Sequence, residues 1–211
     1  MLEHAIPIKL GGNATEHLVQ LFDTDESLVD GVAEFLCQGL MGNEQMLVVM
    51  DEERWNAVEM HLSALGQPID EAVRFGHLIV RNAKHTLNKF MVGDRPHPQL
   101  FSASVGTLVS GLAAFGKPLR IYGEMVDVLV GRGQYAAACE LEELWNELGR
   151  RRRFTLLCGY MAGHFGDPRN AGDLLQICAT HSRVRSDPED VLGSFLMSRH
   201  SDSLTTGNRP G

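Results

Sequence analysis

The feature that most constrains this chain is a series of short apolar runs of strand length, with patterns of helical periodicity between them. One run, Met46 to Met50, reads Met-Leu-Val-Val-Met and has no polar position to turn toward solvent. Such a run is typical of a strand in a parallel sheet that is covered on both faces. Strands that alternate with helices indicate β-α-β units. The sequence therefore predicts a three-layer α/β fold with a mainly parallel sheet and helices on both faces.

Five runs predict the strands of this sheet, at residues 17–23, 45–51, 78–82, 119–123 and 154–160. Longer amphipathic patterns predict helices at about 25–41, from a cap at Asp51 to Gly66, at about 98–115, and at 135–148. In the last of these, Leu141, Trp145 and Leu148 belong to an apolar stripe. The glutamates at 140, 142, 143 and 147 are expected on the remaining, solvated face.

The pattern predicts four parts along the chain. We expect an N-terminal extension at 1–16, the α/β domain at 17–166, a C-terminal helical cap at 167–197, and a disordered tail at 198–211. No strand is expected after Gly166. The tail is predicted to be disordered because it has little apolar content to bury.

The net charge and the cysteine pattern limit the cellular compartment and the classes of partner that we expect. The 211 residues carry a formal net charge of −8, which disfavours a nucleic-acid surface, because phosphate neutralisation needs clustered Lys and Arg. The four cysteines stand singly and form no Cys-x-x-Cys pair, as expected for buried thiols in a reducing cytoplasm. No apolar run approaches the roughly 20 residues of a membrane-spanning helix. We therefore expect a cytoplasmic protein with neither a nucleic-acid nor a membrane partner.

The order of several short segments resembles one known family. These segments are His17-Leu-Val-Gln-Leu-Phe, Glu34-Phe-Leu-Cys-Gln-Gly-Leu, Asn43-Glu-Gln-Met-Leu-Val-Val-Met, Gly123-Glu124-Met125 and Leu141-Glu-Glu-Leu-Trp-Asn146. They resemble the MEDS domain, the sensory domain of methanogens, methylotrophs and the regulator DcmR, over about 17–166. The resemblance implies a sensory domain that recognises a small organic molecule and acts in signal transduction or transcription regulation. Because no region has the pattern of a kinase or DNA-binding module, the signal is expected to pass to a protein partner in trans or through self-association.

That family in turn resembles KaiC-like and RecA-like ATPases, whose phosphate-binding loop contains Gly-Lys-Thr. The corresponding positions here hold Ser27, Leu28 and Val29, and the loop from Asp23 to Ser27 contains three carboxylates and no glycine. Each carboxylate would repel a phosphate charge by about 4 kcal/mol at 4 Å for an effective dielectric of 20. We therefore expect a degenerate loop, no cofactor and no enzymatic activity. A residual nucleotide-binding enzyme that uses Asp51, Glu52 or Glu124, and an interaction scaffold without a ligand, are the alternatives.

Candidate ligand-binding residues gather mainly at the carboxyl edge of the predicted sheet, where open parallel sheets bind their ligands. They are Asp23, Asp51, Glu124 and the aromatic residues Phe22, Tyr122 and Tyr160, with Phe165 beyond them. His17, at the start of the first strand, is a further candidate, because the family resemblance also implies a histidine there. Each has a structural interpretation as well: Asp51 and Glu124 can cap helices, and His17 can be a core residue.

Metal ligation has only a weak signal in the sequence. Cys158, His164, Cys178 and His181 are the nearest approach to a ligand set, and Cys178 and His181 stand three residues apart, as on one helix face. Zinc sites usually supply closer ligand pairs such as Cys-x-x-Cys. The sequence therefore predicts no metal.

Overall fold

The computed structural model describes residues 15–185, so the predictions for the disordered tail and for the segment before Thr15 lie outside the described residues. Its centre is a six-stranded sheet in the order β3-β2-β6-β7-β1-β8, and every neighbouring pair in this sheet is parallel. The strands are β1 (Glu16–Phe22), β2 (Gln45–Met50), β3 (Leu78–Asn82), β6 (Leu119–Gly123), β7 (Thr155–Met161) and β8 (Arg183–Arg185). A separate antiparallel pair joins β4 (Met91–Val92) to β5 (Arg95–Pro96).

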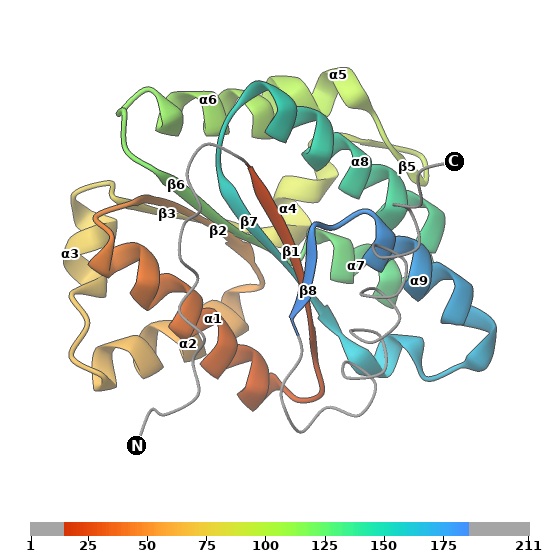
Figure 1. Cartoon of the computed structure of the whole chain (residues 1–211), viewed down its shortest axis with the longest axis horizontal. Helices are drawn as coiled ribbons and strands as arrows, with labels where there is room; N and C mark the ends of the chain where they lie inside the picture. Colours follow the sequence, from red (N-terminus) through yellow and green to blue (C-terminus); the bar gives the residue numbers. More distant parts are fainter. Residues whose placement is uncertain (1–14, 186–211) are drawn as a thin grey trace, which may run out of the picture.

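Helices cover both faces of the sheet, as Figure 1 shows. One face carries α1 (Asp25–Met41), α2 (Glu52–Ala64) and α3 (Ile69–Arg74). The other carries α4 (Ala83–Asn88), α5 (Pro98–Phe101), α6 (Thr107–Ala113), α7 (Met125–Gly131), α8 (Tyr135–Arg151) and α9 (Ala171–Ala179). A π-helical segment, Ser102–Gly106, connects α5 to α6, so the helix predicted at about 98–115 is continuous. The predicted three-layer, mainly parallel α/β class is confirmed.

The prediction that the strands end before Gly166 is wrong, because β8 adds a sixth strand beside β1. It has three residues, of which only Val184 is apolar and buried. So short a segment shows no periodicity, and backbone pairing with Leu18, Val19 and Gln20 places it in the sheet.

The solvated position expected for Glu142 is also wrong. Glu142 is 0% exposed, because α9 and the segment before β8 pack beside α8 and widen its buried face. Its neighbour Glu143 is exposed, as predicted.

A two-residue connection, Asp23 and Thr24, leads from β1 into α1. Thr24 caps the helix: its hydroxyl accepts from the backbone N–H of Ser27, and the Ser27 hydroxyl accepts from the backbone N–H of Thr24. This capping box satisfies donors at the helix start that would otherwise lack partners. A tight turn of Asp23 and Thr24 therefore occupies the position that a phosphate-binding loop has in KaiC-like ATPases.

The α1 side of the core contains a buried ion pair. The Arg120 side chain donates from Nε to Glu44 Oε2 at 2.7 Å and from Nη2 to Glu44 Oε1 at 3.0 Å. Its guanidinium carbon lies 4.6 Å from the centre of the Phe35 ring. Both charged side chains are almost completely buried, so each depends on the other for compensation.

On the same face, Gly159 of β7 provides space for Tyr122 of β6. A Cβ atom at Gly159 would collide with the Tyr122 hydroxyl and would lie 3.1 Å from the Phe22 ring. The Tyr122 hydroxyl is buried and has no hydrogen-bond partner among the described residues. This part of the core is packed without room for another methyl group.

Candidate functional site

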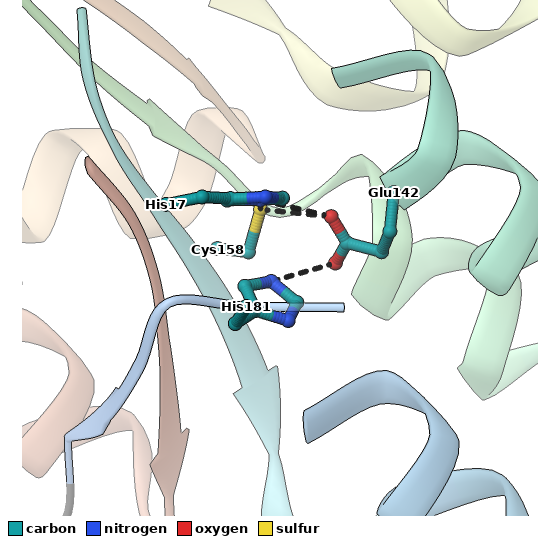
Figure 2. A group of neighbouring side chains, drawn as sticks. All are labelled: His17, Glu142, Cys158 and His181. Carbon is teal, nitrogen blue, oxygen red and sulfur yellow. Dashed lines mark hydrogen bonds and ion pairs between the residues drawn. The ribbon is translucent and has the colours of Figure 1, made fainter. Parts of the chain in front are cut away.

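The structure brings four potential ligand side chains together on the α8 side of the sheet: His17, Glu142, Cys158 and His181, hereafter the tetrad. His17 is at the start of β1, Cys158 is in the middle of β7, Glu142 is on α8, and His181 lies just before β8. Figure 2 shows the side chains converging from these four elements. All four residues are buried.

The atoms that face one another in the tetrad are closely spaced. Glu142 Oε2 lies 3.2 Å from His17 Nε2 and 3.4 Å from Cys158 Sγ, and Glu142 Oε1 lies 3.3 Å from His181 Nε2. His17 Nε2 lies 3.3 Å from Cys158 Sγ. One atom from each residue can be chosen so that all four lie within 4.8 Å of one another.

Outer hydrogen bonds set the orientation of both imidazole rings. His181 Nδ1 lies 2.7 Å from the carbonyl oxygen of Ile177, which can only accept, so Nδ1 is the donor. His17 Nδ1 lies 2.9 Å from Asn146 Oδ1, and the amide nitrogen of Asn146 donates to the Thr180 carbonyl. Both rings therefore present Nε2 to the centre of the tetrad.

The charge of the tetrad is concentrated on Glu142. Burial raises its pKa, but His181 and His17 outweigh burial and hold the pKa of this carboxyl well below its ordinary value. Burial lowers the pKa of His17, and the hydrogen bond and charge of Glu142 outweigh this effect, so the net shift is upward. Tyr160 adds a hydrogen bond of 2.6 Å to Glu142 Oε1. The carboxylate is thus ionised and compensated without solvent.

The Cys158–His17–Asn146 arrangement has the connectivity of a cysteine nucleophile, its base and an orienting amide. Its electrostatics oppose that role. Burial, together with the charge of Glu142 and a hydrogen bond to it, raises the pKa of the Cys158 thiol well above its ordinary value. A nucleophilic cysteine needs a lowered pKa, so this thiol lacks the activation that acyl-transfer chemistry requires.

A pocket of about 520 Å³ opens beside the tetrad. It lies between the start of β1, the end of α8 and the segment before β8, and its lining includes His17, His181 and Asn146. Apolar walls come from Trp145 and Phe154, and polar groups come from Thr15, Arg150, Thr180 and Ser182. Its volume falls within the roughly 300–1,000 Å³ of small-molecule sites.

The carboxyl edge of the sheet, where most ligand-binding residues were predicted, contains a charge network centred on Arg54. Arg54 Nη1 donates to Glu124 Oε2 at 3.1 Å and to Asp127 Oδ2 at 3.3 Å, and Arg54 Nε donates to Asp25 Oδ1 at 3.1 Å. Glu124 also accepts from the backbone N–H of Asp51. Burial raises the pKa of Glu124, although Arg54 acts in the opposite direction.

Asp51 has the structural contacts that its position suggested. Its carboxylate caps α2 by accepting from the Glu53 N–H at 3.1 Å, and it receives Lys84 Nζ at 2.9 Å. The hydrogen bond from Lys84 lowers the pKa of Asp51. Asp23 is exposed and lies in the turn before α1. Ligand binding at this edge stays a prediction.

The four predicted aromatic residues are divided between the two faces of the sheet. Phe22 and Tyr122 pack on the α1 side. Tyr160 and Phe165 pack on the α8 side, with ring centres 5.9 Å apart. In the sheet Tyr160 pairs with Leu21, the neighbour of Phe22, and side chains alternate along a strand, so Phe22 and Tyr160 point to opposite faces.

The predicted metal candidates also separate. His181 and Cys158 enter the tetrad, whereas Cys178 packs in the core and His164 lies 3.3 Å from Asp127 Oδ1 near the carboxyl edge.

Several residues of these sites were not predicted, among them Glu142 in the tetrad, Asn146 beside it and Arg54 at the carboxyl edge. The spacing of Ala138, Leu141, Glu142 and Trp145 carries a signal for the first, because Glu142 falls on the same helix face as the three apolar residues. Asn146 follows Glu142 by four residues, one turn further along the helix. Arg54 follows Asp51 in α2 and has no comparable signal, because its partners come from other parts of the chain.

Fold and site together define a parallel three-layer α/β domain with a buried polar centre and an adjoining pocket. The family model for the MEDS domain, the methanogen/methylotroph, DcmR sensory domain, matches residues 16–182. The chain belongs to this family of sensory domains. The comparison with curated proteins returned no match. Among the described residues, no helix has the length and apolar character needed to cross a membrane.

Proposed function

We propose that this chain is a non-catalytic sensor that binds a small organic molecule in the pocket beside the tetrad and passes its signal to a protein partner. The observation that carries the proposal is the contact between this pocket and His17, His181 and Asn146. A molecule in the pocket meets side chains that connect β1, α8, β7 and the segment before β8. Its binding therefore acts on contacts between elements that are distant in the sequence.

The lining indicates the chemistry of the ligand. Trp145 and Phe154 offer apolar surface, and Arg150 at the end of α8 offers a hydrogen-bond donor. A small molecule with an apolar body and one hydrogen-bond acceptor, such as a ketone, ester or amide, matches these groups. Without a chemical step, such a sensor acts by changing a protein contact, which supports a partner in trans or a second copy of the chain.

Arg150→Ala is expected to weaken ligand binding about tenfold, the effect of losing one charge-assisted hydrogen bond worth roughly 1.4 kcal/mol. Native mass spectrometry of the freshly purified full chain identifies a retained molecule. A thermal-shift screen of small ketones, esters and amides finds one where none is retained. Arg151→Ala is the matched control, because Arg151 is the next residue of α8 and does not line the pocket. Equal losses in both variants, or no stabilising compound, would argue against the pocket.

The non-catalytic part of the proposal is supported by the β1–α1 connection. Two residues closed by a capping box, with Asp25 and Glu26 directly after them, leave no loop to surround a phosphate. Near Asp51, the carboxylate of Glu124 is engaged by Arg54 and by a backbone N–H. These groups hold the start of α2 in place.

ATP turnover by the purified chain is expected to equal the buffer background, because the connection from β1 into α1 has neither the lysine nor the glycines of a phosphate-binding loop. Phosphate release with ATP and magnesium measures it, and Glu52→Gln is the control for a carboxylate acting on the nucleotide. Sustained turnover that disappears in this variant would favour the residual-enzyme alternative.

A further inference from the structure

We propose that His17, Glu142, Cys158 and His181 bind one divalent transition-metal ion of the zinc type. The site goes beyond the proposed function, because it rests on the tetrad itself and does not require the small-molecule ligand. The site joins residues from both ends of the described chain, so its ligands form no local spacing motif in the sequence.

The ligand set has the chemistry that zinc selects. It offers two imidazole nitrogens, one sulfur and one carboxylate oxygen, which are the donor types found in protein zinc sites. Calcium and magnesium prefer oxygen ligands, so the sulfur and the two nitrogens select against them. A divalent ion with one carboxylate and one thiolate also gives a site with no net charge, as burial requires.

The spacing of the donors fits one small ion. Ligands at the usual zinc distances of about 2.0–2.3 Å lie roughly 3.3–3.7 Å apart at the corners of a tetrahedron. His17 Nε2, Glu142 Oε2 and Cys158 Sγ lie 3.2, 3.3 and 3.4 Å from one another, and His181 Nε2 lies 3.3 Å from the other carboxylate oxygen, Glu142 Oε1.

The outer contacts are those of a metal site. A metal-binding histidine usually donates its second ring N–H to a carbonyl or carboxylate, which directs the other nitrogen at the ion. His181 does so through Ile177, and His17 does so through Asn146. Tyr160 donates to Glu142 in the same outer layer.

His181 Nε2 gives an independent indication. Its side chain is fully buried, and this nitrogen has no hydrogen-bond partner among the described residues, although Glu142 Oε1 lies 3.3 Å away. With its proton on Nδ1, which donates to the Ile177 carbonyl, the neutral ring turns the Nε2 lone pair to the centre of the tetrad, and a metal ion supplies the partner that this buried lone pair lacks. The pocket beside His17 and His181 provides a route for the ion from solvent.

Cobalt(II) titration of the full chain tests the proposal, after dialysis against a chelator and under a non-thiol reductant. We expect saturation at one equivalent, the strong visible bands of four-coordinate cobalt, a thiolate-to-cobalt charge-transfer band in the near ultraviolet, and displacement by zinc. Cys158→Ser should abolish the charge-transfer band and weaken binding more than about 100-fold, beyond the 10–100-fold loss typical of outer-layer changes.

Cys178→Ser is the matched control, because Cys178 is also a buried cysteine on this face but has no place in the tetrad. It should retain the whole cobalt spectrum. The wild-type chain provides a second measurement that does not depend on how a variant folds: X-ray absorption of the zinc-loaded chain should show one sulfur ligand together with nitrogen and oxygen ligands. Absence of the bands, their persistence in Cys158→Ser, or a zinc shell without sulfur overturns the site.

The small-molecule proposal and the metal proposal fail separately. Arg150→Ala should keep the cobalt spectrum, because Arg150 belongs to the pocket and not to the tetrad. If the chain binds neither cobalt nor zinc but still responds normally to the small molecule, the metal site is rejected and the small-molecule proposal is retained.

Discussion

Arg120→Leu is expected to lower the free energy of unfolding by about 3–5 kcal/mol, the typical effect of removing one partner from a buried ion pair. The substitution leaves the Glu44 carboxylate buried without its two hydrogen bonds from Arg120. It also removes the cation from the face of Phe35. Urea unfolding followed by circular dichroism measures the change.

A double variant separates the loss of the pair from the loss of packing. Arg120→Met combined with Glu44→Leu should recover most of the stability, because hydrophobic residues of similar volume often replace buried ion pairs at little cost. If the double variant is less stable than Arg120→Leu alone, the pair contributes more than it costs to bury, and this account of the core is wrong.

Gly159→Ala is expected to destabilise the fold by about 1–3 kcal/mol, the usual effect of adding a methyl group to a filled core. The new Cβ would meet the Tyr122 hydroxyl and the Phe22 ring, both on the α1 side of the sheet. Thermal and urea unfolding of the purified variant measure the loss.

Tyr122→Phe provides the rescue. By itself it should leave stability nearly unchanged or raise it, because the hydroxyl that it removes is buried and unpartnered among the described residues. Combined with Gly159→Ala, it should restore part of the lost stability, since the phenolic oxygen is the nearest obstacle to the added carbon. Strictly additive effects of the two changes would contradict the proposed collision.

Most of the fold could be predicted because its signals are local. The apolar run of β2, the stripe of α1 and the cap at Asp51 each extend over a few neighbouring residues, and all three match the structure. Short elements lacked such signals. The edge strand β8 contains only one buried apolar residue, and its place depends on backbone hydrogen bonds to β1.

The site was harder to predict because its parts are distant in the sequence. The sequence indicates His17 and His181 separately, and its spacing pairs His181 with Cys178, three residues away along the chain. The structure instead joins His181 to Glu142, Cys158 and His17 through the packing of α8 on the sheet. Sequence spacing finds ligands within one helix or loop, and it gives no information on ligands that only the tertiary fold assembles.

The segment before β8 contacts the start of β1, although the two are almost a whole domain apart in the sequence. The backbone N–H of His17 donates to Ser182 Oγ, 165 positions away. During synthesis from the N-terminus, His17 is made first, and its partner His181 is made last of the four tetrad residues. A nascent chain can pair the earlier strands of the sheet before the edge strand β8 has been made. Bringing such remote residues together costs loop-closure entropy before any contact compensates for it, so we expect the tetrad to assemble late in folding. An intact tetrad therefore requires that β1, α8, β7 and the segment before β8 have all reached their native positions.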